Sequence, residues 1–173
     1  MSPEILVVVS SETGRTLTLA EAFCEGARDA GAAVERVDAA DAQPAQLENA
    51  AGLVIGSAVH MAGVASSMRA FFERTAPLWL SGAAAGKLGA GFVCAGLGGR
   101  GGGELALVEI HAFLAEHGCL SVPMRRGVPG FAEAGSHWGP IAENTEAPAI
   151  SALTSHGRGF AEALLRWQRG ATD

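Results

Sequence analysis

The stretch ILVVVSSETGRTLTLAEAF, residues 5–23, predicts a buried strand, a polar loop and the start of a helix. Residues 5–9 are a continuous aliphatic run, which is typical of a parallel strand that is covered on both faces. The loop at residues 10–16 offers four hydroxyls, backbone N–H groups and Gly14, which permits positive φ. Apolar residues then recur near helical spacing, at Leu17, Ala20 and Phe23.

A loop of this kind at a helix N-terminus is suited to bind an anion. Unpaired N–H groups point outward there, and the helix dipole favours negative charge. Hydroxyls before a helix often serve only as caps. Four hydroxyls exceed what one cap requires, however, and ligands of α/β proteins lie beyond the carboxyl ends of the strands. We therefore expect a phosphate cradle made of Ser11, Glu12, Thr13, Gly14, Arg15 and Thr16.

Composition restricts the class of protein. The 173 residues, 49% apolar and 17% charged, suit a single well-buried domain over residues 1–173. The net charge of −6 argues against a nucleic-acid surface, which needs clustered Lys and Arg. The three scattered cysteines predict reduced core thiols, and neither they nor the five histidines show metal-ligand spacing, so we expect no metal site.

The ends and the hydropathy of the chain predict a cytoplasmic protein. The first strand begins almost at the N-terminus, which leaves no room for a signal peptide. No apolar run is long enough to span a membrane, so we expect no membrane partner.

Five strand-like runs alternate with helical patterns along the chain. The strands are expected at residues 5–9, 33–37, 53–57, 87–95 and 119–122. This alternation predicts an α/β three-layer sandwich with a five-stranded parallel sheet in the order 2-1-3-4-5, whose crevice opens beyond the first and third strands. A helix from residue 65 should end before Pro77, and residues 125–145 have no clear period, which is typical of a functional or mobile loop.

Three loops should meet at one edge of this sheet, at residues 10–16, 58–63 and 95–103. The first supplies donors for a phosphate, and the other two can sandwich a planar ring. Glycines in the third loop allow close approach and offer N–H donors, although a flexible surface turn is the alternative. The same loop contains GLGGRG, a weak match to the dinucleotide-binding fingerprint, because it follows the fourth strand and lacks the acidic residue that holds a ribose.

The first loop resembles a known signature. The run VVSSETGRTLTLAEAF from Val8 is similar to the phosphate-binding loop of flavodoxins, whose marked positions are filled by Ser11, Gly14, Thr16 and Ala20. Val9 departs from the aromatic residue that the family places before the loop. The resemblance implies a flavodoxin-like sandwich in which this loop binds the 5′-phosphate of FMN.

A second resemblance extends over most of residues 4–123. The segments GSAVHMAGVASSMRAFFERTAPLW from Gly56 and SGAAAGKLGAGFVCAG from Ser81 are similar to the WrbA-type NAD(P)H:quinone oxidoreductases. The resemblance implies that Trp79 walls the substrate side. From its place on the loop after the third strand, His60 either contacts flavin or a substrate oxygen or faces solvent, and we expect the site role. The resemblance also implies flavin contacts from Ala58, Val59, His60, Met61, Cys94, Ala95, Gly96, Leu97, Gly98 and Gly99.

The chain departs from that family at several positions. The family loop PTRFGN is replaced by residues 58–63, AVHMAG. Glu116 stands where the family has the first histidine of His-His-Gly, and Thr13 takes the place of a loop aromatic. These departures bear on quinone preference and on assembly more than on the flavin site.

The resemblance implies an FMN-dependent oxidoreductase. NAD(P)H would donate a hydride to non-covalent FMN, which would reduce a quinone-like acceptor, and no side chain need act as a catalytic acid or base. Two alternatives stay open: a flavodoxin-type electron carrier without its own turnover, and a flavin-free interaction protein. The reductases that it resembles are oligomers, which implies a homodimer or homotetramer.

Overall fold

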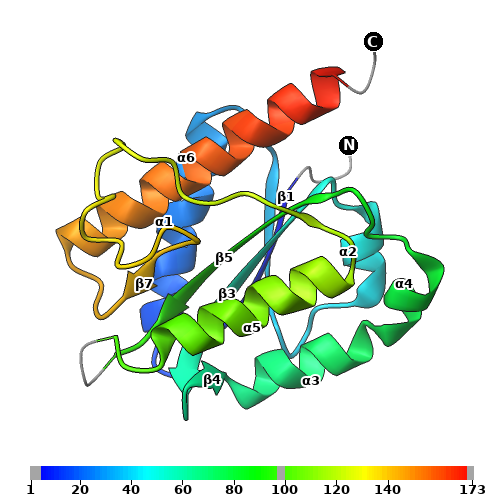
Figure 1. Cartoon of the computed structure of the whole chain (residues 1–173), viewed down its shortest axis with the longest axis horizontal. Coiled ribbons are helices and arrows are strands. Elements are labelled where there is room, and N and C mark those ends of the chain that lie inside the picture. The colour runs from blue at the N-terminus through cyan, green and yellow to red at the C-terminus, as the bar shows by residue number, and fades with distance from the viewer. Residues whose placement is uncertain (1–4, 97–99, 171–173) are drawn as a thin grey trace.

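The computed structural model describes residues 5–96 and 100–170. Strands and helices alternate along most of the chain (Figure 1). In order they are β1 (Ile5–Ser10), α1 (Arg15–Asp29), β2 (Val34–Asp38), α2 (Pro44–Asn49), β3 (Gly52–His60), β4 (Gly63–Val64), α3 (Ser66–Arg74), α4 (Ala76–Ser81), β5 (Leu88–Cys94), α5 (Gly103–Glu116), β6 (Leu120–Ser121), β7 (Ile141–Ala142) and α6 (Ala147–Gly170).

The main sheet has the predicted parallel order, β2-β1-β3-β5-β6. Two short strands add to it: β4 folds back antiparallel on the end of β3, and β7 pairs parallel with β5. The α/β sandwich and its strand order are therefore confirmed, while the expected five strands become seven.

The last position of the sheet is shared by two separate pieces of chain. Strand β6 pairs with the beginning of β5, where Leu88 faces Leu120, and β7 pairs with its end, where Val93 faces Ile141. The expectation of one strand at residues 119–122 followed by a loop was therefore incomplete. Residues 122–140 are an insertion within a single strand position, and the chain then returns to the sheet.

Both faces of the sheet are covered by helices. Alternate residues of β1 enter two different clusters, with Ile5 on the side of α1 and α6 and Leu6 on the side of α2 to α5. Figure 1 shows these two layers with the sheet between them. Every residue of β1 is buried, and each buried aliphatic side chain stabilises the fold by about 1.5–3 kcal/mol.

Pro77 does not end a helix as expected. Helix α3 ends at Arg74, and Pro77 lies in the first turn of α4, where an N–H group has no intrahelical acceptor and its loss is harmless. Residues 66–81 thus contain two consecutive helices, α3 and α4. Within the described residues, no helix is long and apolar enough to cross a membrane.

Helices α1 and α6 pack at backbone distance through two glycines. A Cβ on Gly157 would lie 2.0 Å from the carbonyl oxygen of Phe23, and one on Gly26 would lie 2.0 Å from that of Thr154. Because both obstacles are main-chain atoms, any side chain at either position would push the helices apart.

We predict that Gly157→Ala lowers the free energy of unfolding by about 1–3 kcal/mol, because the methyl group overpacks the α1–α6 contact. Gly159→Ala is the matched control on the same helix, since a Cβ there meets nothing within 4 Å. It should raise the stability by about 0.5–1 kcal/mol, through helix propensity alone. Urea unfolding followed by circular dichroism measures both values, and equal effects would contradict this account.

Candidate functional site

A hollow of about 240 Å³ opens where β1, β3 and β5 end. The three loops that were expected to meet do so here. The residues that line the hollow are Glu12, Thr13, Arg15, Thr16, Ala58, Val59, His60, Cys94, Ala95 and Gly96. All ten belong to the predicted cofactor-binding set.

The first loop presents main-chain donors at the start of α1. Within the described residues, the N–H groups of residues 12–16 make no hydrogen bond to the protein. Gly14 takes the N-cap position with φ of 85°, a conformation that favours glycine. Free N–H groups and the dipole of a helix of 15 residues together favour an anion at this place.

The Ser11 hydroxyl of this loop stabilises the start of α1, whereas Thr13 and Thr16 line the hollow. Ser11 Oγ accepts a hydrogen bond of 3.2 Å from the N–H of Leu17, so it caps α1 and keeps its own proton available to donate. Thr13 and Thr16 line the hollow, and Thr16 is almost fully buried there. Ser11 and Gly14 belong to the loop but do not line the hollow.

Arg15 supplies a positive charge beside the hollow. A terminal nitrogen of its guanidinium would lie 3.0 Å from a Cβ placed on Gly96, so the side chain reaches from the first loop to the third. Burial raises the pKa of the Cys94 thiol, and the charge of Arg15 and a hydrogen bond with Thr16 oppose that shift in part. Cys94 is therefore a protonated lining residue at neutral pH.

His60 connects the second loop with the first. Its Nδ1 lies 3.6 Å from Oε1 of Glu12, and both side chains are partly exposed at the rim. The structure thus brings residues 12 and 60 together, with an imidazole and a carboxylate at the same rim of the hollow.

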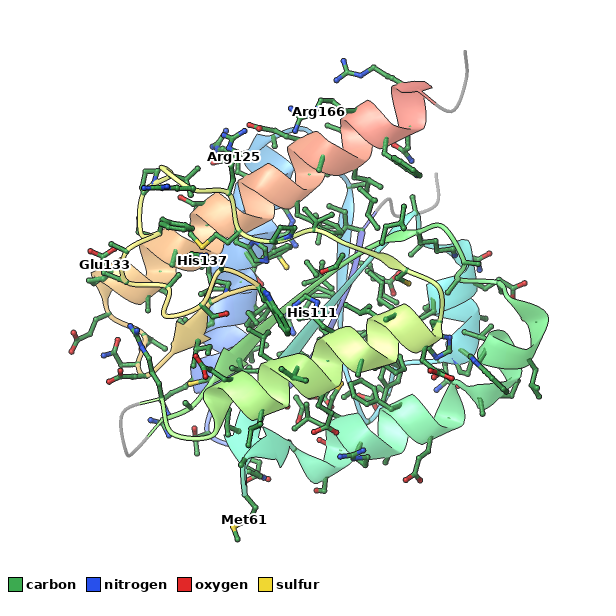
Figure 2. The ribbon with its side chains drawn as sticks, viewed as in Figure 1. Met61, His111, Arg125, Glu133, His137 and Arg166 are labelled. Atoms are coloured by element: carbon green, nitrogen blue, oxygen red, sulfur yellow. The ribbon has the colours of Figure 1, made fainter. Side chains whose placement is uncertain are left out.

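The second loop is a hairpin rather than the irregular loop expected at residues 58–63. Strand β3 continues to His60, and the chain turns through Met61 and Ala62, whose φ values are 48° and 64°. Tight hairpin turns require such positive angles. The turn places Met61 fully in solvent, as Figure 2 shows, so the expected contact of Met61 with the hollow is not present.

Three polar contacts that the sequence did not reveal hold these loops in place. Ser10 Oγ lies 2.6 Å from Ser67 Oγ and ties the end of β1 to α3. Ser57 Oγ accepts the N–H of Ala65 at 3.0 Å, and Glu109 accepts the N–H of Val64 at 3.0 Å. Two of the contacts join segments distant in the chain, and the third closes the turn between residues 57 and 65, so none has a recognisable spacing in the sequence.

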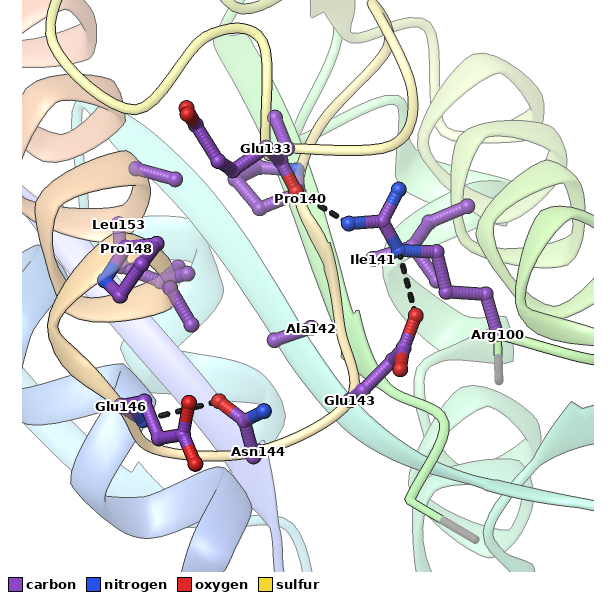
Figure 3. Close-up of a pocket in the computed structure, with 13 residues that line it drawn as sticks. Arg100, Glu133, Pro140, Ile141, Ala142, Glu143, Asn144, Glu146, Pro148 and Leu153 are labelled. Atoms are coloured by element: carbon purple, nitrogen blue, oxygen red, sulfur yellow. Dashed lines mark hydrogen bonds and ion pairs between the residues drawn. The ribbon is translucent and has the colours of Figure 1, made fainter. Parts of the chain in front are cut away.

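The third loop packs against the hairpin and is fastened at its far end. A Cβ on Gly102 would lie 2.7 Å from Cα of Ala62, and the φ of Gly102 is 76°. The lack of space and the positive φ each favour glycine at this position. Figure 3 shows Arg100 between Glu143, at 3.1 Å, and the carbonyl of Glu133, at 2.5 Å. The predicted contacts of Leu97, Gly98 and Gly99 lie outside the described residues.

Trp79 does not reach this hollow within one chain. It lies on α4, half exposed, in a different hollow that α3, α4 and α5 form with Phe72, Phe113 and His117. Within a single chain, Trp79 therefore does not take the expected place at the substrate side.

Lys87 has a structural role, because its Nζ donates to the carbonyls of Leu47 and Glu48 at the end of α2, at 2.7 and 2.6 Å.

A comparison with known families and structures agrees with this geometry. The family model described as Flavodoxin matches residues 7–127. Among solved structures, a flavodoxin and WrbA-like protein from Agrobacterium tumefaciens aligns with a TM-score of 0.78 at 21% identity, over 95% of this chain and 99% of that one. A flavodoxin from the domain Archaea aligns with a TM-score of 0.73 at 22% identity, over 93% and 98% of the two chains.

A further solved structure has the same fold at lower sequence identity. Oxidised flavodoxin 1 from Bacillus cereus aligns with a TM-score of 0.70 at 17% identity, over 91% of this chain and 97% of that one. At these identities the structures support the fold, and the chemistry must come from the residues that line the hollow.

The first loop brings hydroxyls and the Arg15 guanidinium to the hollow, while the second and third loops contribute mainly small or apolar residues, among them Ala58, Val59 and Gly96. No cluster of His, Cys, Asp and Glu that could hold a metal ion occurs among residues 5–96 and 100–170.

We predict that no thiol of the folded protein reacts rapidly with Ellman's reagent at pH 8. Burial raises the pKa of Cys94 and raises those of Cys24 and Cys119 to about 11, and the thiolate is the reactive species. All three cysteines should react after unfolding in guanidinium. A fast phase that Cys94→Ser removes would show instead that the hollow contains a reactive nucleophile.

Proposed function

Because the chain belongs to the flavodoxin family, we propose that the hollow binds FMN and that the protein transfers electrons through it. The phosphate would lie in the first loop, against the N–H groups of residues 12–16. The flavin ring would lie between the end of β3 and residues 94–96. The unpaired donors at the start of α1 are the observation that carries this proposal.

The residues present fit such a group. A phosphate dianion needs several donors and a positive charge, which the loop N–H groups, the hydroxyls of Thr13 and Thr16, and Arg15 provide. A flat ring needs close backbone approach, which Ala58 and Gly96 allow. Several charge-assisted hydrogen bonds of about 1.5–3 kcal/mol each would support a dissociation constant of about 1 μM.

Bound FMN would supply hydride and single-electron transfer, which no side chain of the hollow offers. The protein would bind, orient and shield it. Arg15 and the helix dipole would balance the phosphate charge, and the protonated Cys94 would present a neutral surface to the ring. His60 and Glu12, at the open rim, are placed to meet whatever approaches from solvent.

We propose further that the protein oxidises NAD(P)H and reduces a quinone-like acceptor. The support is the open space over the expected ring position, where Ala58, Val59 and His60 line the hollow and no Trp, Tyr or Phe is among the described residues that line it. An acceptor that stacks on a flavin needs such space, whereas an electron carrier commonly covers its flavin with aromatic side chains. The resemblance to quinone reductases through residues 56–96 points the same way.

We predict that the protein binds FMN at least about 100-fold more tightly than riboflavin, because only FMN has the phosphate that the first loop is built to hold. Thr16→Val should weaken FMN binding about tenfold and leave riboflavin binding unchanged. Quenching of flavin fluorescence during titration measures both ligands. Equal affinity for the two, or no binding of either, would contradict FMN binding at this loop and favour the flavin-free interaction protein.

We predict steady oxidation of NADH or NADPH when the FMN-loaded protein is given a benzoquinone as acceptor. Absorbance at the nicotinamide band reports the rate, and protein without FMN is the control. Turnover that depends on FMN would establish the reductase. An FMN-loaded protein that shows no turnover with either nucleotide, but accepts electrons from dithionite, would be an electron carrier.

A further inference from the structure

A serine and a histidine meet at the open edge of the sheet, away from the proposed flavin site. Ser121 Oγ, on β6, lies 3.0 Å from Nδ1 of His111, on α5, and Ser121 is exposed to solvent. Ser121 pairs with Gly89 near the start of β5, whereas the flavin hollow lies at the other end of that strand. The pair therefore has no part in the proposed function.

The other nitrogen of His111 determines which way this hydrogen bond runs. His111 projects from α5 toward the insertion (Figure 2), and its Nε2 lies 3.1 Å from the carbonyl oxygen of Trp138. A carbonyl oxygen can only accept, so Nε2 carries the proton, and the neutral ring has a lone pair on Nδ1. The Ser121 hydroxyl therefore donates to Nδ1, as a nucleophile does to its general base.

The surroundings of His111 keep the imidazole neutral and fix its orientation. Burial lowers the pKa of His111 below its usual value, and the hydrogen bond with the Trp138 carbonyl opposes that shift only in part. The indole of Trp138 packs edge-on against the imidazole, with ring centroids 5.7 Å apart. At neutral pH His111 is thus held between a hydroxyl and a carbonyl, in the state that can accept a proton.

The main chain of Ser121 offers a donor beside the hydroxyl. The N–H groups of Leu120 and Val122 both point toward β5, where they donate to Lys87 and Gly89 at 2.8 Å. Directions alternate along a strand, and β6 is the last strand of the main sheet, so the N–H of Ser121 points toward the open edge. The described part of the chain provides it with no backbone acceptor. Such a group can donate to the oxygen on which charge develops during acyl transfer.

An apolar hollow lies beside the pair. Its volume is about 370 Å³, and it is lined by Glu104, Leu107, Val108, Ser136, His137 and Trp138. Val108 precedes His111 by one turn of α5, and Trp138 contacts His111 through both its ring and its carbonyl. Because Trp138 belongs to the hollow and to the pair, an apolar group bound in the hollow would lie close to the Ser121 hydroxyl.

We propose that Ser121 is a nucleophile that takes the acyl group of small esters, with His111 as its general base. Ser121 Oγ would form a bond to the acyl carbon while its proton passes to Nδ1 of His111. The bond to the leaving oxygen would then break, and His111 would return the proton to the leaving alcohol or phenol. Water would release the acid from Ser121 by the same route, so the net reaction is ester hydrolysis. The hollow would hold the apolar part of the ester.

The probe is p-nitrophenyl acetate, and the absorbance of released p-nitrophenolate gives the rate. The natural chain should accelerate the release, and mass spectrometry of peptides from an early time point should find the acetyl group on Ser121. Ser121→Ala and His111→Gln should each lower the protein-dependent rate about 100-fold or more, because a positioned general base contributes about 10²–10⁴-fold.

Ser81→Ala is the matched control and should keep the full rate. Ser81 is also exposed, but its hydroxyl donates to the carbonyl of Leu78 at 3.1 Å, which cannot take a proton. If the His111 variant does not fold, a fluorophosphonate probe decides with the natural chain. The probe loses fluoride when a serine attacks its phosphorus, and it should label Ser121 in the folded protein and not after unfolding in guanidinium.

Two results would overturn the proposal. One is acetyl or phosphonyl groups found only on residues other than Ser121, which would show general surface reactivity. The other is a rate that Ser121→Ala and Ser81→Ala leave equally unchanged, which would give the contact of Ser121 with His111 a structural role alone. Ser121→Ala should leave FMN affinity unchanged, so failure here is distinguishable from failure of the proposed function.

Discussion

Main-chain N–H groups at the start of α1 are the constraint around which the candidate site is arranged. A helix cannot satisfy these groups itself, and here no side chain or backbone acceptor of the described residues does so. Their position follows from β1, whose six buried residues place the loop at the carboxyl edge of a parallel sheet. The core therefore determines where the unsatisfied donors stand, and the donors determine what the edge can bind.

The sequence predicted most of the fold because its long elements are repetitive. The aliphatic runs of β1, β3 and β5 are buried throughout their central residues and could hardly be assigned otherwise. Strands β6 and β7 have two residues each and show no period, so nothing local marks Ile141 as part of the sheet. Pro77 was misjudged because a proline can start a helix as well as end one.

The candidate site was predicted as a set of loops and less well as individual side chains. Ten of the predicted residues line one hollow because parallel strands bring their ends to one edge. Met61 lies in solvent because the chain makes a tight turn there without the Asn-Gly pair that usually announces one. Trp79 lies elsewhere because it stands on α4, which forms a different hollow with α3 and α5.

The divided last strand has a consequence for how the molecule behaves at high concentration. A long outer strand would offer an unbroken row of pairing groups to any neighbouring chain and would invite ordered aggregation. Here β6 and β7 have only two residues each, those of β7 are buried, and the inserted chain passes so close to β5 that a Cβ on Gly139 would lie 1.9 Å from the carbonyl oxygen of Gly91. The insertion therefore protects this border of the sheet, beside β5, against adding foreign strands.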